Sequence, residues 1–280
     1  MLNPPRLEPI DYLAVGHLSK DLVPGGVQIG GSVAYAARTV HALGLRAGIV
    51  TSCGGEFALD ALEEIPIVNI PSENSTTFEN VTTPAGRLQT LHCSAEPLAY
   101  FHIPEIWRGA PIVHLAPIAN ELAPDLVRHF SDALLCVSPQ GWLREWDGTG
   151  RVRPRDWPES EFVLRRADAV VFSREDLGDL RVEDLVAPVP VAVMTDGHRG
   201  AYLYAQGEEV HFNAAQYTEV DATGAGDIFA AAFFTRFHMS HDPTDAVRFA
   251  IQVASRSVTR QGLDSAPTQD ELYDLMPKAN

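Results

Sequence analysis

The sequence predicts a three-layer α/β fold, with a mostly parallel central sheet and helices on both of its faces. Short apolar runs of four to six residues alternate with helical patterns along most of the chain, which is typical of a parallel sheet. The 280 residues suit one large domain. A hydrophobic fraction of 45% with 21% charged residues is that of a globular protein. We therefore expect residues 1–280 to form a single domain.

The elements of this fold follow from hydrophobic periodicity. Residues 11–16 are expected to be the first strand, 32–43 a helix that Gly44 ends, and 46–51 the next strand. Further short apolar runs predict four more strands, at 112–116, 133–137, 169–172 and 191–195. Helices are expected between several of these strands, at 121–131, 161–166 and 175–180.

The segment 75–104 departs from this pattern. Two alternating, Thr-rich runs, 76–83 and 87–94, flank a Pro-Ala-Gly turn, which predicts a β-hairpin inserted into the α/β body. Such a hairpin could be a lid over a site or an ordinary surface hairpin. Residues 141–158 are rich in Trp, Arg, Gly and Pro, and we expect them to form a long loop.

The charge and the lysine content exclude several classes of protein. Lys+Arg number 21 against 37 Asp+Glu, a formal net charge of −16, so nucleic acid is not an expected partner. The two lysines, Lys20 and Lys278, follow neither the glycine of a P-loop nor a Val-Ala-x pattern, which excludes P-loop enzymes and protein kinases.

The sequence also favours a cytoplasmic location. Its three cysteines are far apart and flanked by small or apolar residues, as buried thiols in a reducing compartment are. No apolar run reaches membrane-spanning length, and the start lacks the pattern of a signal peptide, so no membrane partner is expected.

One motif, within residues 219–234, carries the chemistry. The chain turns through Gly224-Ala225-Gly226 and enters an apolar helix at Asp227. Successive N–H groups at a helix N-terminus favour an anion, and the carboxylate beside them could accept a proton from a substrate hydroxyl. The alternative interpretation is structural, with Asp221 and Asp227 as helix caps and the glycines as a turn. No third glycine is present, so this is not a dinucleotide fingerprint.

This motif resembles the signature D-T-x-G-A-G-D of the pfkB, or ribokinase-like, carbohydrate kinases, with Ala222 at the usual Thr position. Further segments resemble the family's motifs in the same order along nearly the whole chain. They are the opening strand and substrate aspartate at 15–21, the Gly-Gly turn and helix at 30–37, the strand and loop bordering the nucleotide at 195–200, and the segment closing the nucleotide site at 257–262.

The resemblance implies an ATP-dependent phosphotransferase with a ribokinase-like fold. Asp227 would be the catalytic base, and the N–H groups of Gly224, Ala225 and Gly226 would form an anion hole. The residues implied for the substrate are Asp21, Gly30, Gly31, Tyr35 and Gln140, and those implied for ATP are Thr195, Gly197, Gly200, Thr223 and Gly262. Mg²⁺ would be held chiefly by phosphates and water. Taken alone, Asp21 and the glycines could equally be turn residues.

The chain departs from the family at several positions. Ser173-Arg-Glu-Asp176 replaces the N-x-x-E motif, so Asp176 is expected to reach Mg²⁺ through water, unless it is a plain first-turn acid. Tyr35 stands where ribokinases carry Asn, which argues against ribose, although it could simply pack in the helix. The stretch from Gln140 to Arg144 is similar to the inositol kinases of the family, or could be loop polar residues. Asp221 would take part in a monovalent-cation (K⁺) site.

The resulting hypothesis is phosphorylation of a hydroxyl on a small sugar or polyol, inositol-like in type. A nucleoside kinase of the same fold is the alternative, since Tyr35 could stack on a base. A third hypothesis is a non-catalytic relative that only binds its ligands, and the intact Asp227 argues against it. Eight residues separate Asp21 from Gly30, so we expect a lid reduced to little more than the 76–94 hairpin, in a monomer or homodimer.

Overall fold

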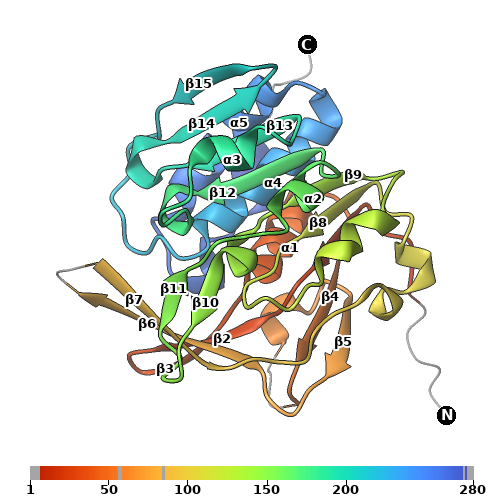
Figure 1. Ribbon diagram of the computed structural model, residues 1–280, viewed down its shortest axis with the longest axis vertical. Coiled ribbons are helices and arrows are strands. Elements are labelled where there is room, and N and C mark those ends of the chain that lie inside the picture. Colours follow the sequence, from red (N-terminus) through yellow and green to blue (C-terminus); the bar gives the residue numbers. More distant parts are fainter. Residues whose placement is uncertain (1–6, 56–58, 84–85, 274, 276–280) are drawn as a thin grey trace.

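The computed structural model describes residues 7–55, 59–83, 86–273 and 275. Its main sheet has nine strands in the order β15-β14-β13-β12-β9-β8-β1-β4-β5 (Figure 1). From β13 to β5 all neighbours are parallel, and the edge strands β14 and β15 are antiparallel. The bounds are β1 Tyr12–Val15, β4 Ala47–Cys53, β5 Ile67–Pro71, β8 Ile112–Leu115, β9 Leu134–Val137, β12 Ala169–Ser173, β13 Val191–Thr195, β14 Ala201–Ala205 and β15 Glu208–Phe212. The predicted strands are therefore confirmed, apart from their end residues.

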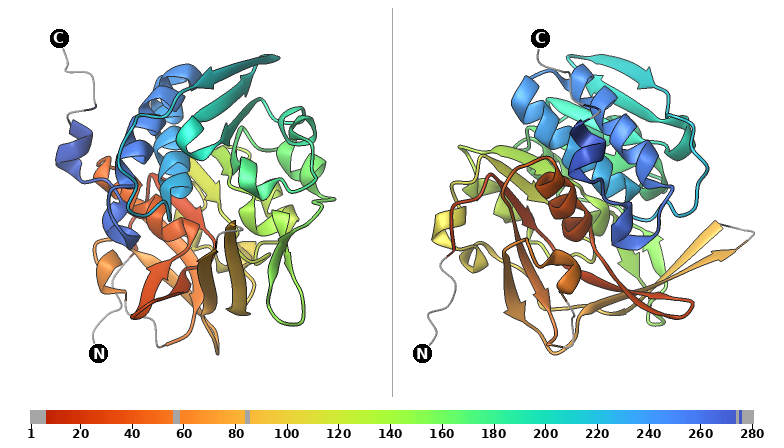
Figure 2. Two further views of the ribbon diagram at one scale, coloured as in Figure 1. Left: turned by 90° about the vertical axis from the view of Figure 1, so that its left-hand side faces the viewer. Right: turned by 180° about the vertical axis from the view of Figure 1, so that it is seen from behind.

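Helices cover both faces of this sheet, as predicted. On one face lie α1 (Ser32–Ala42), α4 (Ala225–Ser240) and α5 (Pro243–Ser257), seen in front of the sheet in the view from behind (Figure 2). The other face is covered by α2 (Ser160–Leu164), α3 (Val182–Val186) and several 3₁₀ turns. Each face has its own apolar cluster, since β1, β8, β9, β12 and β13 send alternate side chains to opposite sides.

Two of the expected helices are shorter and tighter than predicted. Residues 121–131 contain only the 3₁₀ helix Pro124–His129, and 175–180 contain the end of another, Arg174–Asp176. Gly178 has a φ of +54°, which stops the second one. The helix expected at 161–166 is α2, and the one at 32–43 is α1, which ends one residue early. The remaining short helices are 3₁₀ turns at Asp60–Leu62, Tyr100–His102, Glu105–Trp107, Gln140–Leu143, Gly197–Arg199 and Gly262–Ser265, and α6 at Gln269–Tyr273.

A second sheet, which we call the lid sheet, projects from one end of the main sheet (Figure 1). Its order is β3-β2-β6-β7, with bounds β2 Ser19–Val23, β3 Gly26–Gly30, β6 Thr76–Thr83 and β7 Gly86–Cys93. The hairpin β6-β7 was predicted, but the expectation of a lid that is little more than this hairpin is wrong. The short stretch after β1 forms its own hairpin, β2-β3, and β2 pairs with β6 in parallel.

We expected residues 141–158 to form one long loop, and this prediction is wrong. They form a small antiparallel hairpin of β10 (Arg144–Trp146) and β11 (Val152–Pro154). The Leu91 N–H of β7 donates to the Gly150 carbonyl at 2.8 Å, so this hairpin supports the lid sheet from outside. A Cβ on Gly150 would lie 2.2 Å from the Leu91 oxygen, so the contact requires glycine. In the described part of the chain, no helix is long and apolar enough to cross a membrane.

Candidate active site

The candidate site lies at the carboxyl ends of the parallel strands, where ligands of open α/β sheets usually bind. The chain leaves β1, β8, β9, β12 and β13 at this edge, and α4 begins there. Two adjoining cavities open at this edge. We call them the inner cavity, of about 80 Å³, and the outer cavity, of about 760 Å³. Five residues border both cavities: Gln89, Gln140, Arg144, Gly224 and Asp227.

The inner cavity gathers most of the residues that the sequence predicted for the acceptor substrate. Those that border it are Asp21, Gly31, Tyr35 and Gln140, together with Asp227. Gly30 is not on its surface but lies beside it. A Cβ at Gly30 would stand 2.3 Å from the Asp21 carboxylate, so glycine is required for close packing there.

Other polar side chains of the inner cavity were missed from the sequence. They are Ser19, Ser32, Asn80 and Gln89. The Ser19 hydroxyl donates to the Asp21 carboxylate at 2.9 Å, and the Gln89 amide donates to the Asn80 oxygen at 2.9 Å across the lid hairpin. The alternation of the hairpin could have indicated one face carrying Asn80 and Gln89, but nothing in the sequence shows that this face meets β2.

Asp227 stands between the two cavities. Burial raises its pKa to about 6, and the nearby carboxylates of Asp176 and Asp21 add to this, while a hydrogen bond with Ser32 and the charge of Arg144 oppose it. A base with a pKa near the working pH is suited to proton abstraction. Asp227 also lies in the first turn of α4, where N–H groups lack intrahelical acceptors.

The turn that precedes α4 depends on glycine at one position. Gly224 has a φ of +80°, and a Cβ there would lie 2.3 Å from the ring of Tyr35. Tyr35 is only 2% exposed, so its ring packs beneath this turn. A Cβ on Gly226, in contrast, would meet nothing within 4 Å, because this residue faces the outer cavity.

The backbone of the predicted anion hole is partly engaged. The Ala225 N–H donates to the Ala222 carbonyl at 3.2 Å, and the Ile228 N–H donates to the Gly224 carbonyl at 2.9 Å. Both Ala225 and Gly226 border the outer cavity. An anion hole at this helix start stays a prediction.

The outer cavity is bordered by three of the five residues predicted for the nucleotide. Thr195, Gly197 and Gly200 border it on one side. Apolar side chains of α4 and α5 border it on the other, with Tyr217 nearby: Phe229, Ile251, Ala254 and Val258. This half-apolar, half-polar lining suits a ligand with a flat organic group and a charged tail.

Asp176 lies at the junction of the cavities. Its carboxylate accepts from the Gln140 amide and the Arg144 guanidinium, each at 3.4 Å. Among the described residues, no group of three His, Cys, Asp or Glu side chains could hold a metal ion. Binding of Mg²⁺ by phosphates and water, with Asp176 acting through water, stays a prediction.

Besides Gly30, two predicted residues lie outside both cavities, Asp221 and Gly262. The Asp221 carboxylate accepts the Thr223 N–H at 2.9 Å and the Gly262 N–H at 3.4 Å. Asp221 and Gly262 therefore join the turn before α4 to the C-terminal segment, while Thr223 borders the inner cavity. A K⁺ role for Asp221 stays a prediction.

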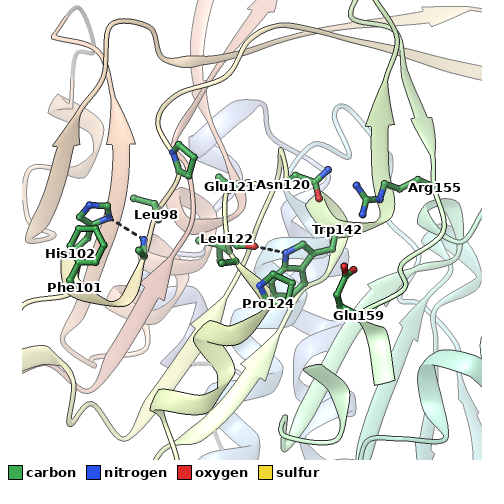
Figure 3. Close-up of a pocket in the computed structure, with 13 residues that line it drawn as sticks. Leu98, Phe101, His102, Asn120, Glu121, Leu122, Pro124, Trp142, Arg155 and Glu159 are labelled. Atoms are coloured by element: carbon green, nitrogen blue, oxygen red, sulfur yellow. Dashed lines mark hydrogen bonds between the residues drawn. The ribbon is translucent and has the colours of Figure 1, made fainter. Parts of the chain in front are cut away.

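A separate groove of about 500 Å³ lies between the segment from Pro97 to His102 and Trp142 (Figure 3). No residue predicted for substrate, nucleotide or metal borders it. The indole N–H of Trp142 donates to the Leu122 carbonyl at 2.8 Å and fixes one side of it.

Sequence comparisons with known proteins find similarity to kinases. Residues 165–270 match the model of the pfkB family carbohydrate kinases. A cytidine kinase from Thermococcus kodakarensis is 23% identical over 90% of this chain and 98% of its own length. An inositol 3-kinase from Zea mays is 29% identical over 52% of this chain and 39% of its own length.

Solved structures extend the likeness to the whole fold. A pyrophosphate-dependent kinase in the ribokinase family superposes with a TM-score of 0.80, at 23% identity over 94% of this chain and 99% of the other. The ribokinase of Arabidopsis thaliana, complexed with ribose and ATP, gives a TM-score of 0.71 at 19% identity, over 95% and 98% of the two chains. These matches confirm the predicted resemblance and the three-layer fold.

Proposed function

We propose that this chain, a pfkB-type kinase with the ribokinase fold, transfers the γ-phosphoryl group of ATP to a hydroxyl of a small polyol of the inositol type. The observation that carries the proposal is the inner cavity. It is small, it is lined by hydroxyl, amide and carboxylate groups, and it has a buried carboxylate at its mouth.

The lining of the inner cavity favours a polyol as the acceptor. Asp21, Asn80, Gln89 and Gln140 offer both donors and acceptors, as several adjacent hydroxyls require. Phe78 and Ile118 supply the apolar surface that the C–H groups of a ring would contact. A volume of about 80 Å³ corresponds to roughly three water molecules of the liquid, which favours a small acceptor over a nucleoside.

The nucleoside alternative needs an aromatic platform for a base. The similarity of the chain to a cytidine kinase is the observation that favours this candidate. Tyr35, which the hypothesis assigned to stacking, packs beneath Gly224 and is 2% exposed. Its ring is therefore not free to stack on a base, and this supports the polyol.

The outer cavity supports ATP as the phosphoryl donor. Ile251, Ala254 and Val258 form an apolar surface that an adenine ring would cover and that pyrophosphate would leave bare. Pyrophosphate is nevertheless the second candidate donor, because the solved neighbours include a kinase that depends on it.

In the proposed mechanism, the polyol lies in the inner cavity with one hydroxyl directed at Asp227. The carboxylate accepts the proton of that hydroxyl as the oxygen attacks the γ-phosphorus in line with the departing ADP. The first-turn N–H groups of α4 stabilise the charge that develops on the transferred group. Mg²⁺, held by Asp176 through water, would supply positive charge that neutralises the phosphates. The lid sheet excludes water that would otherwise hydrolyse ATP.

A panel assay tests this function. ADP release and phosphorylated product are measured with Mg²⁺–ATP against myo-inositol, ribose, fructose, cytidine and adenosine, and product is measured again with pyrophosphate as donor. We expect the highest kcat/KM with myo-inositol and ATP, and none with Asp227→Asn, which controls for a contaminating kinase. If only nucleosides are phosphorylated, the acceptor is a nucleoside and not a polyol. If only pyrophosphate supports turnover, the donor is pyrophosphate and not ATP. No turnover at all would favour the non-catalytic relative.

A further inference from the structure

We propose that Glu121 is the positioning residue of the acceptor site, fixing the inner cavity and the base of the lid sheet in their binding geometry. The inference rests on the proposed function for its kinetic consequence, but its structural basis does not. Glu121 lies in the segment after β8, is 3% exposed, and borders the separate groove (Figure 3) but neither the inner nor the outer cavity.

The carboxylate of Glu121 binds the backbone of two separate loops. Its Oε1 accepts the His17 N–H, from the turn between β1 and β2, at 2.9 Å. Both oxygens accept the Ile118 N–H, at 2.9 and 3.0 Å, and Oε2 accepts the Ala119 N–H at 2.7 Å. Its partners in the described ranges are therefore backbone N–H groups, which together engage both of its oxygens.

Both loops form the inner cavity. The first leads directly into Ser19 and Asp21 on β2, and Ile118 borders the cavity itself. Ile118 and Ala119 also pack against Phe78 and Leu91 of the lid hairpin. Glu121 therefore fixes the position of Ser19 and Asp21 relative to Ile118 and Ala119, which pack against the lid hairpin.

The same turn continues into the base of the lid through His17, whose side chain is fully buried. Its Nε2 lies 2.9 Å from the Glu96 carbonyl and must donate to it, so Nδ1 accepts from the Thr76 hydroxyl at 2.7 Å. The Thr76 hydroxyl oxygen in turn accepts the Ala95 N–H at 3.0 Å. His17 thus ties both ends of the lid hairpin to the loop that Glu121 holds.

The close approach of these loops leaves little room for adjustment. A Cβ on Gly16 would lie 2.3 Å from the Ala116 carbonyl oxygen, and one on Gly141 would lie 2.5 Å from the Ile118 nitrogen. Three strand ends therefore meet backbone to backbone around Glu121. Replacing the carboxylate by an amide puts an NH₂ group against an N–H donor and pushes these loops apart.

The test compares Glu121→Gln with a matched control, Asp168→Asn. Asp168 also accepts a backbone N–H, that of Leu135 at 2.8 Å, but lies at the opposite edge of the sheet, before β12. With myo-inositol and Mg²⁺–ATP as probes, we expect Glu121→Gln to raise the KM for myo-inositol at least about tenfold, on the scale of a misplaced substrate. The KM for ATP should stay within about threefold, and both constants should stay within that range for Asp168→Asn.

Amide hydrogen exchange tests the same inference without activity. Glu121→Gln should speed exchange at His17, Ile118, Ala119 and β2, and leave the loop from Gly197 to Gly200 unchanged. Glu121→Asp, which keeps the charge but has a shorter reach, should be intermediate in both measurements and serves if the amide variant does not fold. Equal changes in both KM values, or exchange unchanged around Glu121, would overturn the proposal. A wild type without kinase activity would overturn the proposed function and leave the exchange result to decide the role of Glu121.

Discussion

At the scale of single residues, the charge that Asp227 would need as a base also lowers the stability of the fold. Its pKa of about 6 in the folded chain lies above the value of 3.8 for an unperturbed Asp, because burial disfavours the charged form. The folded state therefore binds the proton more tightly than the unfolded state. This lowers stability as pH rises from about 4 to about 6, and the loss persists at pH 7.

We predict that Asp227→Asn lowers kcat by about 10²–10⁴-fold, the scale of a lost general base, while it stabilises the fold. The neutral amide removes a buried charge whose penalty is on the order of 1–3 kcal/mol at pH 7. Steady-state kinetics and a thermal melt at pH 7 measure the two effects. A variant that keeps more than about half of the activity would refute the assignment of the base.

The pH profile provides a second residue-scale prediction. Since only the ionised Asp227 accepts a proton, kcat/KM for the acceptor should fall tenfold per pH unit below about pH 6. The charge of Arg144 opposes the rise in the pKa of Asp227. Arg144→Gln should therefore move the fall in kcat/KM to higher pH. The profile is measured from pH 4.5 to 8.5. A limb near pH 4 in the wild type would mean that the Asp227 pKa is not raised.

What the sequence predicted at this scale depended on local spacing. Asp227 and Gly224 lie in one contiguous motif, so their proximity followed from the chain itself. Ser32 and Asn80 come from distant elements, and their approach to Asp227 and Asp21 needs the pairing of sheets that no short motif encodes. Glu121 gave no signal, because its partners are backbone groups.

At the scale of elements, substitutions at the N-terminus of α4 are expected to change kcat without lowering the stability of the fold. A methyl group on Gly226 meets no neighbour, and alanine is a better helix former than glycine. We predict that Gly226→Ala keeps or slightly raises the Tm but lowers kcat, and that Gly226→Val lowers kcat by roughly 10²-fold, as loss of an oxyanion donor does.

A matched glycine gives the control for this helix. Gly109 also has open space around its Cα and lies away from both cavities, so Gly109→Ala should leave kcat unchanged. Near-normal kcat in both Gly226 variants would show that the glycine only shapes the turn.

The lid sheet gives the second element-scale prediction. Replacing residues 79–90 with Asn-Gly should leave a folded protein, because the paired Phe78 and Leu91 keep their contact with Ile118. The variant loses Asn80 and Gln89, so we expect a raised acceptor KM and ADP release in excess of product. Removing 76–94 entirely should lower the Tm as well, since Thr76 holds His17. Product equal to ADP, with an unchanged KM, would show that the hairpin is not a lid.

The elements that could be predicted are those that are buried on both faces. The parallel strands other than β5 appear as unbroken apolar runs, and the observed strands lie within two residues of them; β5, which is only partly buried, was missed. The hairpin β2-β3 was missed because its residues are polar and largely exposed, with Val27 at 59%, and because it gains its partner only from β6. Tertiary pairing, rather than local propensity, makes these strands.

At the scale of the whole molecule, the two ends of the chain form one core. Helix α4 packs on α1, and the ring of Phe234 contacts His114 of β8 at 5.0 Å between centroids. We predict that a chain of residues 1–224 is insoluble or binds a hydrophobic dye, because α1 loses its cover. A chain of residues 1–267, which lacks only α6, should fold with a lower Tm, since Leu272 is 2% exposed. A soluble, cooperative 1–224 fragment would contradict this view of the core.

The position of α4 late in the chain also bears on how the protein is made. About 180 residues separate the end of α1 from the start of α4. At roughly 5–20 residues per second, a ribosome takes on the order of 10–40 s to add them. During that interval the side of α1 that packs on α4 has no permanent partner, although its other side can pack on β1 and β4. The growing chain therefore presents a binding site for chaperones well before it presents one for its substrate, and its yield in cells should depend on the speed of translation through this stretch.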